Sequence, residues 1–234
     1  MKKLIFYILL IFFTLHANAQ VKENLKIPKN PKIGLSLSGG GAKGFAHVGV
    51  LKVLDSLGVK VDYISGTSMG AIVGGLYASG YTGKDIEKII LDTDFYNLIS
   101  NKNNRAESSF FNKSVDKYLL KVPIKNGKAT LPTSISSGQK NLYLLKELFK
   151  NVSNINDFSK LPIPFMCVAT NLETGKIKIF ENGDLSESIL ASSAFPSLMD
   201  PVKIGDSIYV DGAMTVNYPS ELLKKKGIDI VIGV

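Results

Sequence analysis

The chain has 234 residues, 45% hydrophobic and 21% charged, an ordinary globular composition that is sufficient for one sizeable α/β domain. A single cysteine, Cys167 in an apolar run, excludes an intramolecular disulfide, and the lack of any Cys/His cluster argues against a transition-metal site. The formal charge of +8 suits an anionic lipid surface and a nucleic acid equally well and decides little.

The first 19 residues have the layout of a secretory signal peptide. Lys2 and Lys3 precede an apolar run, 4–15, and Ala17-Asn18-Ala19 provides a cleavage site. A membrane anchor, the alternative, needs about 20 apolar residues. We therefore expect cleavage after Ala19 and export, which argues against nucleic acid as a partner. Cleavage leaves 26 Lys and Arg against 20 Asp and Glu, a formal charge of +6.

Residues 20–31 are polar, contain two prolines and are predicted to be a linker into a domain at 32–234. An alternating strand at 32–38 leads into a glycine-rich loop at 39–44, and a helix follows, ending at Gly58. A strand, a glycine loop and a helix bring several unpaired backbone N–H groups to one point, where an anion can bind.

Three functions compete for this loop. Gly39-x-Gly41-x-x-Gly44 satisfies a dinucleotide fingerprint, but the acidic residue that should end the second strand, Asp62, begins it. A Walker loop needs Ser or Thr after Lys43, where this chain has Gly44. The third reading is an oxyanion hole made by the N–H groups of Gly40 and Gly41. A purely structural glycine turn is a further alternative.

The stretch 61–70 has the pattern of a nucleophile elbow. An apolar strand runs into Gly66-x-Ser68-x-Gly70, and the small and apolar residues from Met69 to Tyr77 are predicted to form a helix. A Cβ at Gly66 or Gly70 would clash in such a sharp turn, and the helix N-terminus favours negative charge at Ser68. The alternative is a glycine-rich turn with an incidental serine.

Beyond the elbow, a helix is expected to begin at the N-cap Thr82 and to run through Leu91. The segment 92–140 is harder to interpret. Phe110 and Phe111 begin an amphipathic piece, and 125–128 is a turn between short strands. This segment is either a cover over an active site or a surface insertion.

The remaining elements alternate in the manner of an α/β fold. We predict helices at 138–150, 185–191 and 221–226, and strands at 162–171, 176–180, 208–210 and 228–234. The near-continuous apolar strand at 162–171 is typical of a parallel sheet covered on both faces, and the last strand is expected to be buried as well. Because the chain stops at that strand, we expect it to be the front part of a longer protein.

A catalytic Ser68 requires a base, because serine is a weak nucleophile. The chain has two histidines: His16 leaves with the signal peptide, and His47 lies on a helix that must pack against the sheet. No histidine follows Ser68, which excludes the serine–acid–histidine order of α/β-hydrolases. A carboxylate must then be the base, and Asp211, which ends a strand as Ser68 does, is the best candidate. The alternative for Asp211 is a turn-forming residue before Gly212.

Three blocks of the sequence, taken together and in this order, resemble the patatin-like phospholipase family. They are Gly39-Gly40-Gly41-Ala42-Lys43-Gly44, Gly66-Thr67-Ser68-Met69-Gly70 and Asp211-Gly212-Ala213, and the segment 191–196 resembles the family's alanine/serine/proline stretch. The resemblance implies a three-layer α/β/α fold with a mostly parallel sheet. It also implies a Ser–Asp dyad that hydrolyses lipid acyl esters.

Carried over, Ser68 is the nucleophile and Asp211 the general base, and Gly39, Gly40 and Gly41 surround the oxyanion. Gly44, Gly66, Gly70, Gly212 and Ala213 are the remaining motif residues. We therefore expect an exported phospholipase A or lysophospholipase that acts on phospholipid or another acyl-ester lipid at a membrane surface. This chemistry needs no metal or cofactor. The resemblance suggests the periplasm, the outer membrane or the cell surface as its location. The rivals are a nucleotide-binding domain and a non-catalytic cell-envelope binding or assembly module with a vestigial dyad.

Overall fold

The computed structural model describes residues 28–100, 124–125, 128–129 and 134–234. The predicted signal peptide, most of the predicted linker, and Phe110 and Phe111 of the predicted cover lie outside these residues. Pro31–Val234 form one compact unit, which is described here by itself. Within the described residues, no helix has both the length and the apolar character needed to cross a bilayer.

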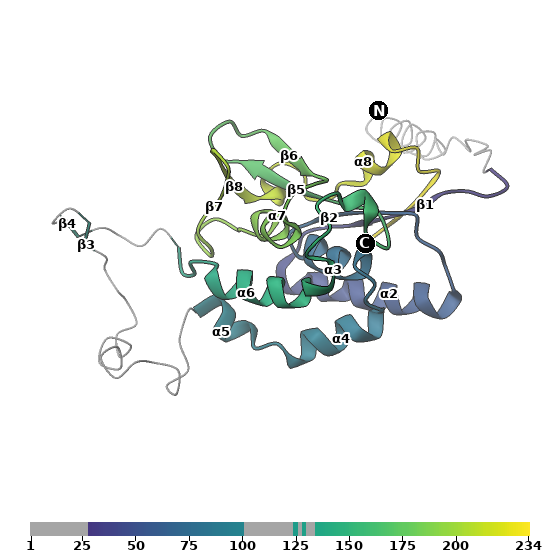
Figure 1. Ribbon diagram of the computed structural model, residues 1–234, viewed down its shortest axis with the longest axis horizontal. Helices are drawn as coiled ribbons and strands as arrows, with labels where there is room; N and C mark the ends of the chain where they lie inside the picture. The colour runs from purple at the N-terminus through teal and green to yellow at the C-terminus, as the bar shows by residue number, and fades with distance from the viewer. Residues whose placement is uncertain (1–27, 101–123, 126–127, 130–133) are drawn as a thin grey trace, which may run out of the picture. The chain divides into compact units, whose positions relative to one another are not determined.

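A seven-stranded sheet forms the centre of this unit (Figure 1). The strands follow the order β7-β8-β5-β2-β1-β9, and β6 pairs with β5 off this path. Their bounds are β1 Ile33–Leu37, β2 Tyr63–Thr67, β5 Phe165–Asn171, β6 Ile177–Phe180, β7 Val202–Ile204, β8 Ser207–Asp211 and β9 Ile230–Gly233. The pairs β1–β2, β1–β9 and β2–β5 are parallel, whereas β5–β6, β5–β8 and β7–β8 are antiparallel. All strands except β6 and β8 thus run in one direction, which confirms the predicted mostly parallel sheet.

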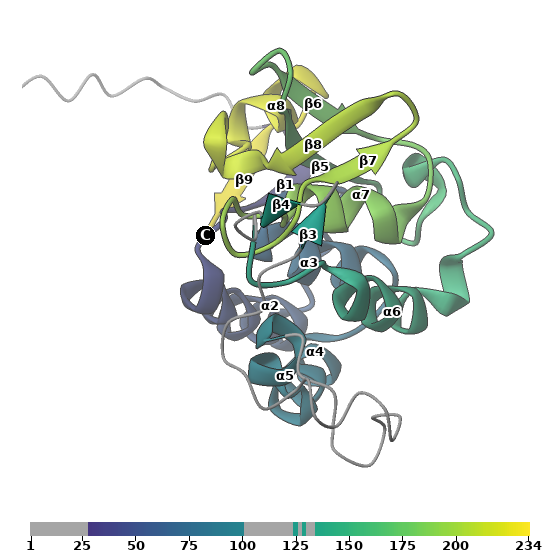
Figure 2. The ribbon, with the colours of Figure 1, turned by 90° about the vertical axis from the view of Figure 1, so that its left-hand side faces the viewer.

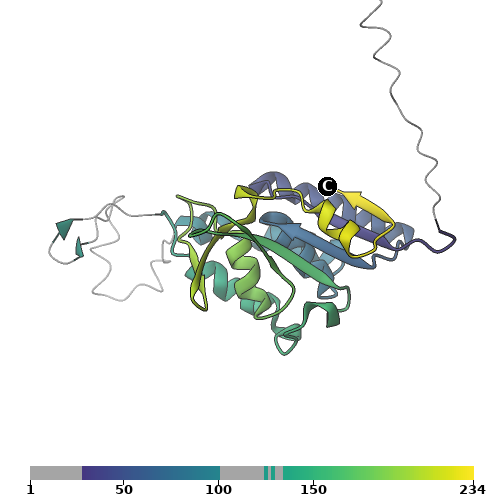
Figure 3. The same cartoon turned by 90° about the horizontal axis from the view of Figure 1, so that it is seen from above.

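Most helices lie on one side of the sheet, as Figures 1 and 2 show. Helix α8 lies on the opposite side, which faces the viewer in Figure 3. The bounds are α2 Ala46–Leu57, α3 Met69–Ala78, α4 Gly83–Asp92, α5 Phe95–Ser100, α6 Gln139–Leu148, α7 Leu185–Ser192 and α8 Ser220–Lys225. Helices α3 and α7 pack against the strands, α4 packs on α2, and α6 packs on α7. The expected α/β/α fold is confirmed, with a single short helix as the second helical layer of the described residues.

Strand β5 separates two hydrophobic cores. Phe165 and Cys167 belong to the large core under α3 and α7, whereas Met166 belongs to a small core with Leu223 of α8. All three β5 side chains are fully buried. The prediction of a strand covered on both faces is therefore confirmed, and burial raises the pKa of the Cys167 thiol.

Two helix ends that were predicted from capping residues are confirmed. Helix α2 ends at Gly58 in the left-handed region, with φ of 63°, and α4 begins with a capping box between Thr82 and Asp85. A 3-10 turn, Gly41–Phe45, precedes α2. The predicted pair of short strands is also confirmed, because β3 (Ile124–Lys125) pairs antiparallel with β4 (Lys128–Ala129). The central residues of the predicted turn, 126–127, lie outside the described residues.

Two elements differ from the sequence-based expectation. The last strand, β9, was expected to be buried but lies at the edge of the sheet next to β1, and its side chains are only partly buried. Helix α5 was not predicted, because its six residues are too few to display a helical period.

Candidate active site

Ser68 occupies a strained turn between β2 and α3. Its backbone has φ of 54° and ψ of −122°, a conformation that non-glycine residues rarely adopt. An added Cβ at Gly66 would lie 2.5 Å from the carbonyl oxygen of Gly70, and one at Gly70 would collide with the backbone of Leu37. The two glycines are thus required by close backbone contact, as predicted, and Ser68 is lifted off the strand end at the N-terminus of α3.

The Ser68 hydroxyl donates a hydrogen bond to Oδ2 of Asp211 over 2.6 Å. Their meeting follows from the register on β5, where Val168 pairs with Thr67 of β2 and the next residue, Ala169, pairs with Asp211 of β8. Strand β6 occupies the other edge of β5 along the same residues, so β2 and β8 share one edge. Because β8 is antiparallel to β5, the carboxyl ends of β2 and β8 meet head-on.

Asp211 is 1% exposed, and both of its carboxylate oxygens are hydrogen-bonded. Oδ1 accepts the N–H of Ala213 over 2.8 Å. Burial raises the pKa of Asp211, and this effect outweighs the lowering caused by the hydrogen bonds from Ser68 and Ala213. A carboxylate with a raised pKa that touches a serine hydroxyl is chemically suited to remove its proton.

Gly212 is required by the same packing. A Cβ at this position would collide with the carbonyl oxygen of Val168 on β5. The predicted close approach of other backbone next to Asp211 is therefore present.

The end of α7 supports both members of the pair. The Ser192 hydroxyl accepts the backbone N–H of Ser68 over 3.0 Å and donates to the carbonyl of Val168 over 2.6 Å. The carbonyl of Ala194 accepts the backbone N–H of Asp211 over 2.9 Å. The sequence pattern at 191–196 resembles a family segment but did not indicate this role for Ser192. The only signal was the position of a small hydroxyl residue in that segment.

The three consecutive glycines of the loop differ in their hydrogen bonding. The N–H of Gly39 donates to the carbonyl of Asn217 over 3.1 Å, and an added Cβ there would lie 3.0 Å from Cβ of Ser68. No hydrogen bond within the described residues uses the N–H of Gly40 or Gly41, and both residues are exposed. Gly40 and Gly41 therefore offer donors, whereas Gly39 provides close packing against Ser68. Gly44 packs against the Met69 side chain.

His47 anchors the start of the glycine loop instead of serving Ser68. It is 3% exposed, and its Nε2 donates to the carbonyl of Ser38 over 2.9 Å. Nδ1 is buried and has no hydrogen-bond partner in the part of the chain that the structure describes. Burial lowers the pKa of His47, so its imidazole is neutral at neutral pH.

The position of Asp62 argues against a dinucleotide-binding role for the glycine loop. Oδ2 of Asp62 accepts the backbone N–H of Ile33 over 2.8 Å, at the start of β1. This position is at the opposite end of the strands from the glycine loop, where a ribose hydroxyl cannot reach it.

An apolar cavity of about 530 Å³ begins at Ser68 and Asp211. Its volume lies within the range of small-molecule sites, and nearly all of its wall is aliphatic or aromatic. We call it the acyl cavity. Its lining includes Met69, Ile72, Val73 and Leu76 of α3, Ile89, Ile90 and Thr93 at α4, Phe95, Leu98 and Ile99 of α5, Asn141, Leu144, Leu145 and Leu148 of α6, and Phe195, Leu198 and Met199.

Comparison with known proteins agrees with this arrangement. The sequence model of the patatin-like phospholipase family matches residues 35–224. A protein of Debaryomyces hansenii named lysophospholipase NTE1 is 32% identical over 209 residues, which cover 89% of this chain and 12% of that protein. An uncharacterized NTE family protein of Mycobacterium tuberculosis is 28% identical over 88% of this chain and 49% of its own length. The chain thus spans at most about half of these relatives.

Among solved structures, VipD from Legionella pneumophila shares the fold. It superimposes with a TM-score of 0.53 at 17% identity, over 88% of this chain and 49% of VipD. At this level of identity, the similarity concerns the fold alone.

Proposed function

Because the chain belongs to the patatin-like phospholipase family, we propose that it is a lipid acyl hydrolase that works through a Ser68–Asp211 dyad. The observation that carries this proposal is the 2.6 Å hydrogen bond between Ser68 Oγ and Asp211 Oδ2 at the mouth of an apolar cavity. A nucleophile, a base and a site for an acyl chain then lie together, as ester hydrolysis requires.

In the acylation step, Ser68 Oγ attacks the ester carbonyl carbon while its proton moves to Asp211. The carbonyl oxygen becomes an oxyanion, which the N–H groups of Gly40 and Gly41 stabilise together with the N-terminus of α3. Collapse of this intermediate breaks the bond between the carbon and the alcohol oxygen. Asp211 returns its proton to that oxygen, so a lyso-lipid or glycerol hydroxyl leaves and the acyl group stays on Ser68.

In the deacylation step, Asp211 takes a proton from water and the resulting hydroxide attacks the acyl-Ser68 carbonyl. The bond between the carbon and Ser68 Oγ breaks, and Asp211 returns the proton to Ser68. The products are a fatty acid and the free enzyme. The chain's own residues supply every proton transfer in this sequence.

We further propose that the substrate is drawn from a lipid surface. Ile99, Phe195 and Leu198 line the acyl cavity, yet 37% of Ile99, 48% of Phe195 and 37% of Leu198 is exposed. Apolar side chains that are both exposed and part of the cavity make its mouth attractive to an acyl chain leaving a bilayer.

The test is fluorophosphonate labelling of the chain, together with fatty-acid release from phospholipid and lysophospholipid vesicles. We expect Ser68→Ala to remove both signals and Asp211→Asn to reduce both strongly. Ser56→Ala, which removes a hydroxyl that donates to the carbonyl of Val53 in its own helix, is the control and should match the wild type. A folded wild type that neither labels nor releases fatty acid would favour a non-catalytic cell-envelope module with a vestigial dyad.

A further inference from the structure

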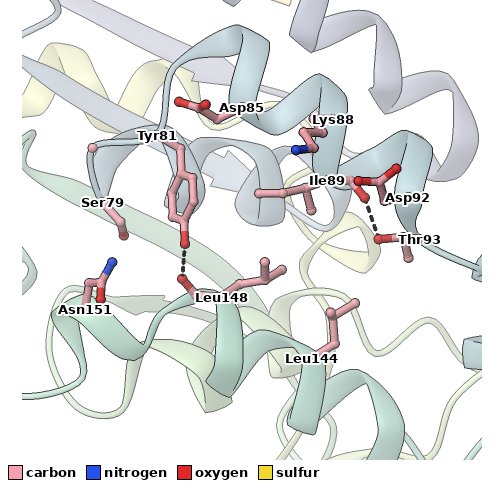
Figure 4. Close-up of a pocket in the computed structure, with 11 residues that line it drawn as sticks. Ser79, Tyr81, Asp85, Lys88, Ile89, Asp92, Thr93, Leu144, Leu148 and Asn151 are labelled. Carbon is pink, nitrogen blue, oxygen red and sulfur yellow. Dashed lines mark hydrogen bonds between the residues drawn. The ribbon is translucent and has the colours of Figure 1, made fainter.

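A second hollow, of about 640 Å³, opens between α4 and α6 (Figure 4). We call it the α4–α6 cleft. Its lining comprises Ser79, Gly80 and Tyr81 after α3, Asp85, Lys88, Ile89, Asp92 and Thr93 at α4, and Leu144, Leu148 and Asn151 at α6. Its charged side chains are exposed and are called its rim, whereas the half-buried Ile89, Leu144 and Leu148 are called its floor.

Four side chains line both the cleft and the acyl cavity: Ile89, Thr93, Leu144 and Leu148. None of them is fully buried. In a close-packed core, such apolar side chains would be surrounded by other atoms. Here each of the four lines both hollows, and we call them together the wall between the hollows.

Two helices beside the hollows, α3 and α6, carry their lining residues in the same order. On α3, the cavity lining ends with Leu76, and the cleft lining begins at Ser79, just past the helix end. On α6, Asn141 lines only the cavity, whereas Asn151 beyond its end lines only the cleft. The two hollows are therefore successive parts of one path that starts at Ser68 and follows α3.

The part of this path that follows α3 is about as long as one leaflet of a bilayer. The ten residues of α3, at about 1.5 Å each, extend about 15 Å. One leaflet of a bilayer is also about 15 Å of hydrocarbon, half of the roughly 30 Å core. An acyl chain attached at Ser68 and lying along α3 thus reaches the wall, and a longer one must pass it.

We propose that the α4–α6 cleft binds the far end of long acyl chains and that the wall residues, above all Ile89 and Leu144, set chain-length preference. This inference rests on the proposed hydrolysis at Ser68. The apolar floor covers the last methylene groups, while the charged rim stays in water. The Tyr81 hydroxyl donates to the carbonyl of Leu148 over 2.6 Å, and this bond ties α6 to the α3–α4 loop and keeps the cleft in shape.

The first test blocks the wall. Leu144→Trp is compared with Tyr143→Trp, which places the same side chain at the neighbouring position, where Tyr143 is 66% exposed. We measure kcat/KM for p-nitrophenyl esters of 4 and 16 carbons. The ratio of the long to the short ester should fall at least about tenfold in Leu144→Trp, since one or two lost methylene contacts are worth that much. It should stay at the wild-type value in Tyr143→Trp. An unchanged ratio in Leu144→Trp would overturn the inference.

The second test does not depend on turnover. A 16-carbon fatty acid with a diazirine on its terminal carbon is photolysed with the Ser68→Ala chain, and the labelled residues are mapped by mass spectrometry. Labels at Tyr81, Lys88 or Asn151 are expected, and labels confined to Phe195 and Leu198 at the mouth would overturn the inference. If the cleft is labelled but the wild type hydrolyses no ester, the proposed function fails and the path stands. If hydrolysis occurs without cleft labelling, the function stands and the path fails.

Discussion

The Ser68–Asp211 corner and the cavity wall are built in opposite ways. At the corner, formed by Ser68, Asp211 and their support Ser192, hydrogen bonds hold both side chains of the dyad and the backbone behind them. At the wall, formed by residues at α4 and α6, apolar side chains such as Ile89 and Leu148 remain half-buried beside open space. The corner tolerates little displacement, whereas the wall has room to change.

The difference suits the two proposed roles, which are positioning of the reacting groups at the corner and binding of an acyl chain at the wall. A misplacement of about 1 Å can cost a hundredfold in rate, so the reacting groups need several independent constraints. An acyl chain offers only dispersion and hydrophobic contact, which depend on area and tolerate variation in shape. Substitutions in the two regions should therefore have different consequences.

After Ser68→Ala, the largest effect on turnover is expected from Asp211→Asn. Loss of the base should lower kcat by about 10²–10⁴-fold. The same substitution should increase the stability of the folded protein. Because the pKa of Asp211 is raised in the folded state, its stabilising contribution is complete at low pH and is lost as pH rises through that pKa. At neutral pH the buried charge is a cost, so the neutral amide should raise the melting temperature, measured by calorimetry. A lower melting temperature would contradict this account of the site.

The same pKa predicts the acid side of the activity profile. Asp211 must be ionised to act as a base, so kcat/KM should fall as pH decreases through its raised pKa. The midpoint should lie above the ordinary aspartate value of about 3.9. An acid limb at or below that value would show that Asp211 is not the base.

Stability should distinguish the core from the wall on a single helix. Ile86 is fully buried, and one turn further Ile89 lines both hollows. Ile86→Ala should cost about 2–5 kcal/mol of unfolding free energy. Ile89→Ala should cost about 1 kcal/mol, because part of its surface already lacks packing partners. Urea denaturation measures both, and equal losses would show that Ile89 is packed as a core residue.

Ser192→Ala should have a smaller effect on turnover than Asp211→Asn. It leaves the Ser68 N–H without its acceptor, and we expect kcat to fall about tenfold, which corresponds to roughly one buried hydrogen bond, with KM little changed. Ser188→Ala is the matched control, since Ser188 is a buried serine of the same helix whose hydroxyl bonds within that helix. If both variants lost the same activity, Ser192 would have only a structural role.

The smallest effect concerns pH and His47. Its pKa is lowered in the folded state, so the unfolded chain binds the proton more tightly. The contribution of neutral His47 to the free energy of unfolding is fully present above about pH 6.5 and decreases as pH falls below that value. The melting temperature should therefore drop more in the wild type than in His47→Gln between pH 7.5 and 5.5. Both proteins contain Asp211, so the difference isolates His47.

Local features of the sequence determined much of this protein. Gly66 and Gly70 predicted the elbow because backbone contacts around a sharp turn leave no room for a Cβ. Thr82 and Gly58 predicted helix ends because capping involves only neighbouring residues. Counting histidines pointed to Asp211, since a serine nucleophile without a histidine after it needs a carboxylate.

The tertiary structure alone decided how these parts meet. The sequence predicted β8 but not its antiparallel direction, and that direction brings Asp211 head-on to Ser68. It also did not predict that the carbonyl of Asn217 accepts the N–H of Gly39 or that the Ser192 hydroxyl accepts the N–H of Ser68. These partners lie 124 residues or more away along the chain. Strand direction, long-range partners and cavities depend on which distant surfaces pack together, and no short stretch of sequence records that.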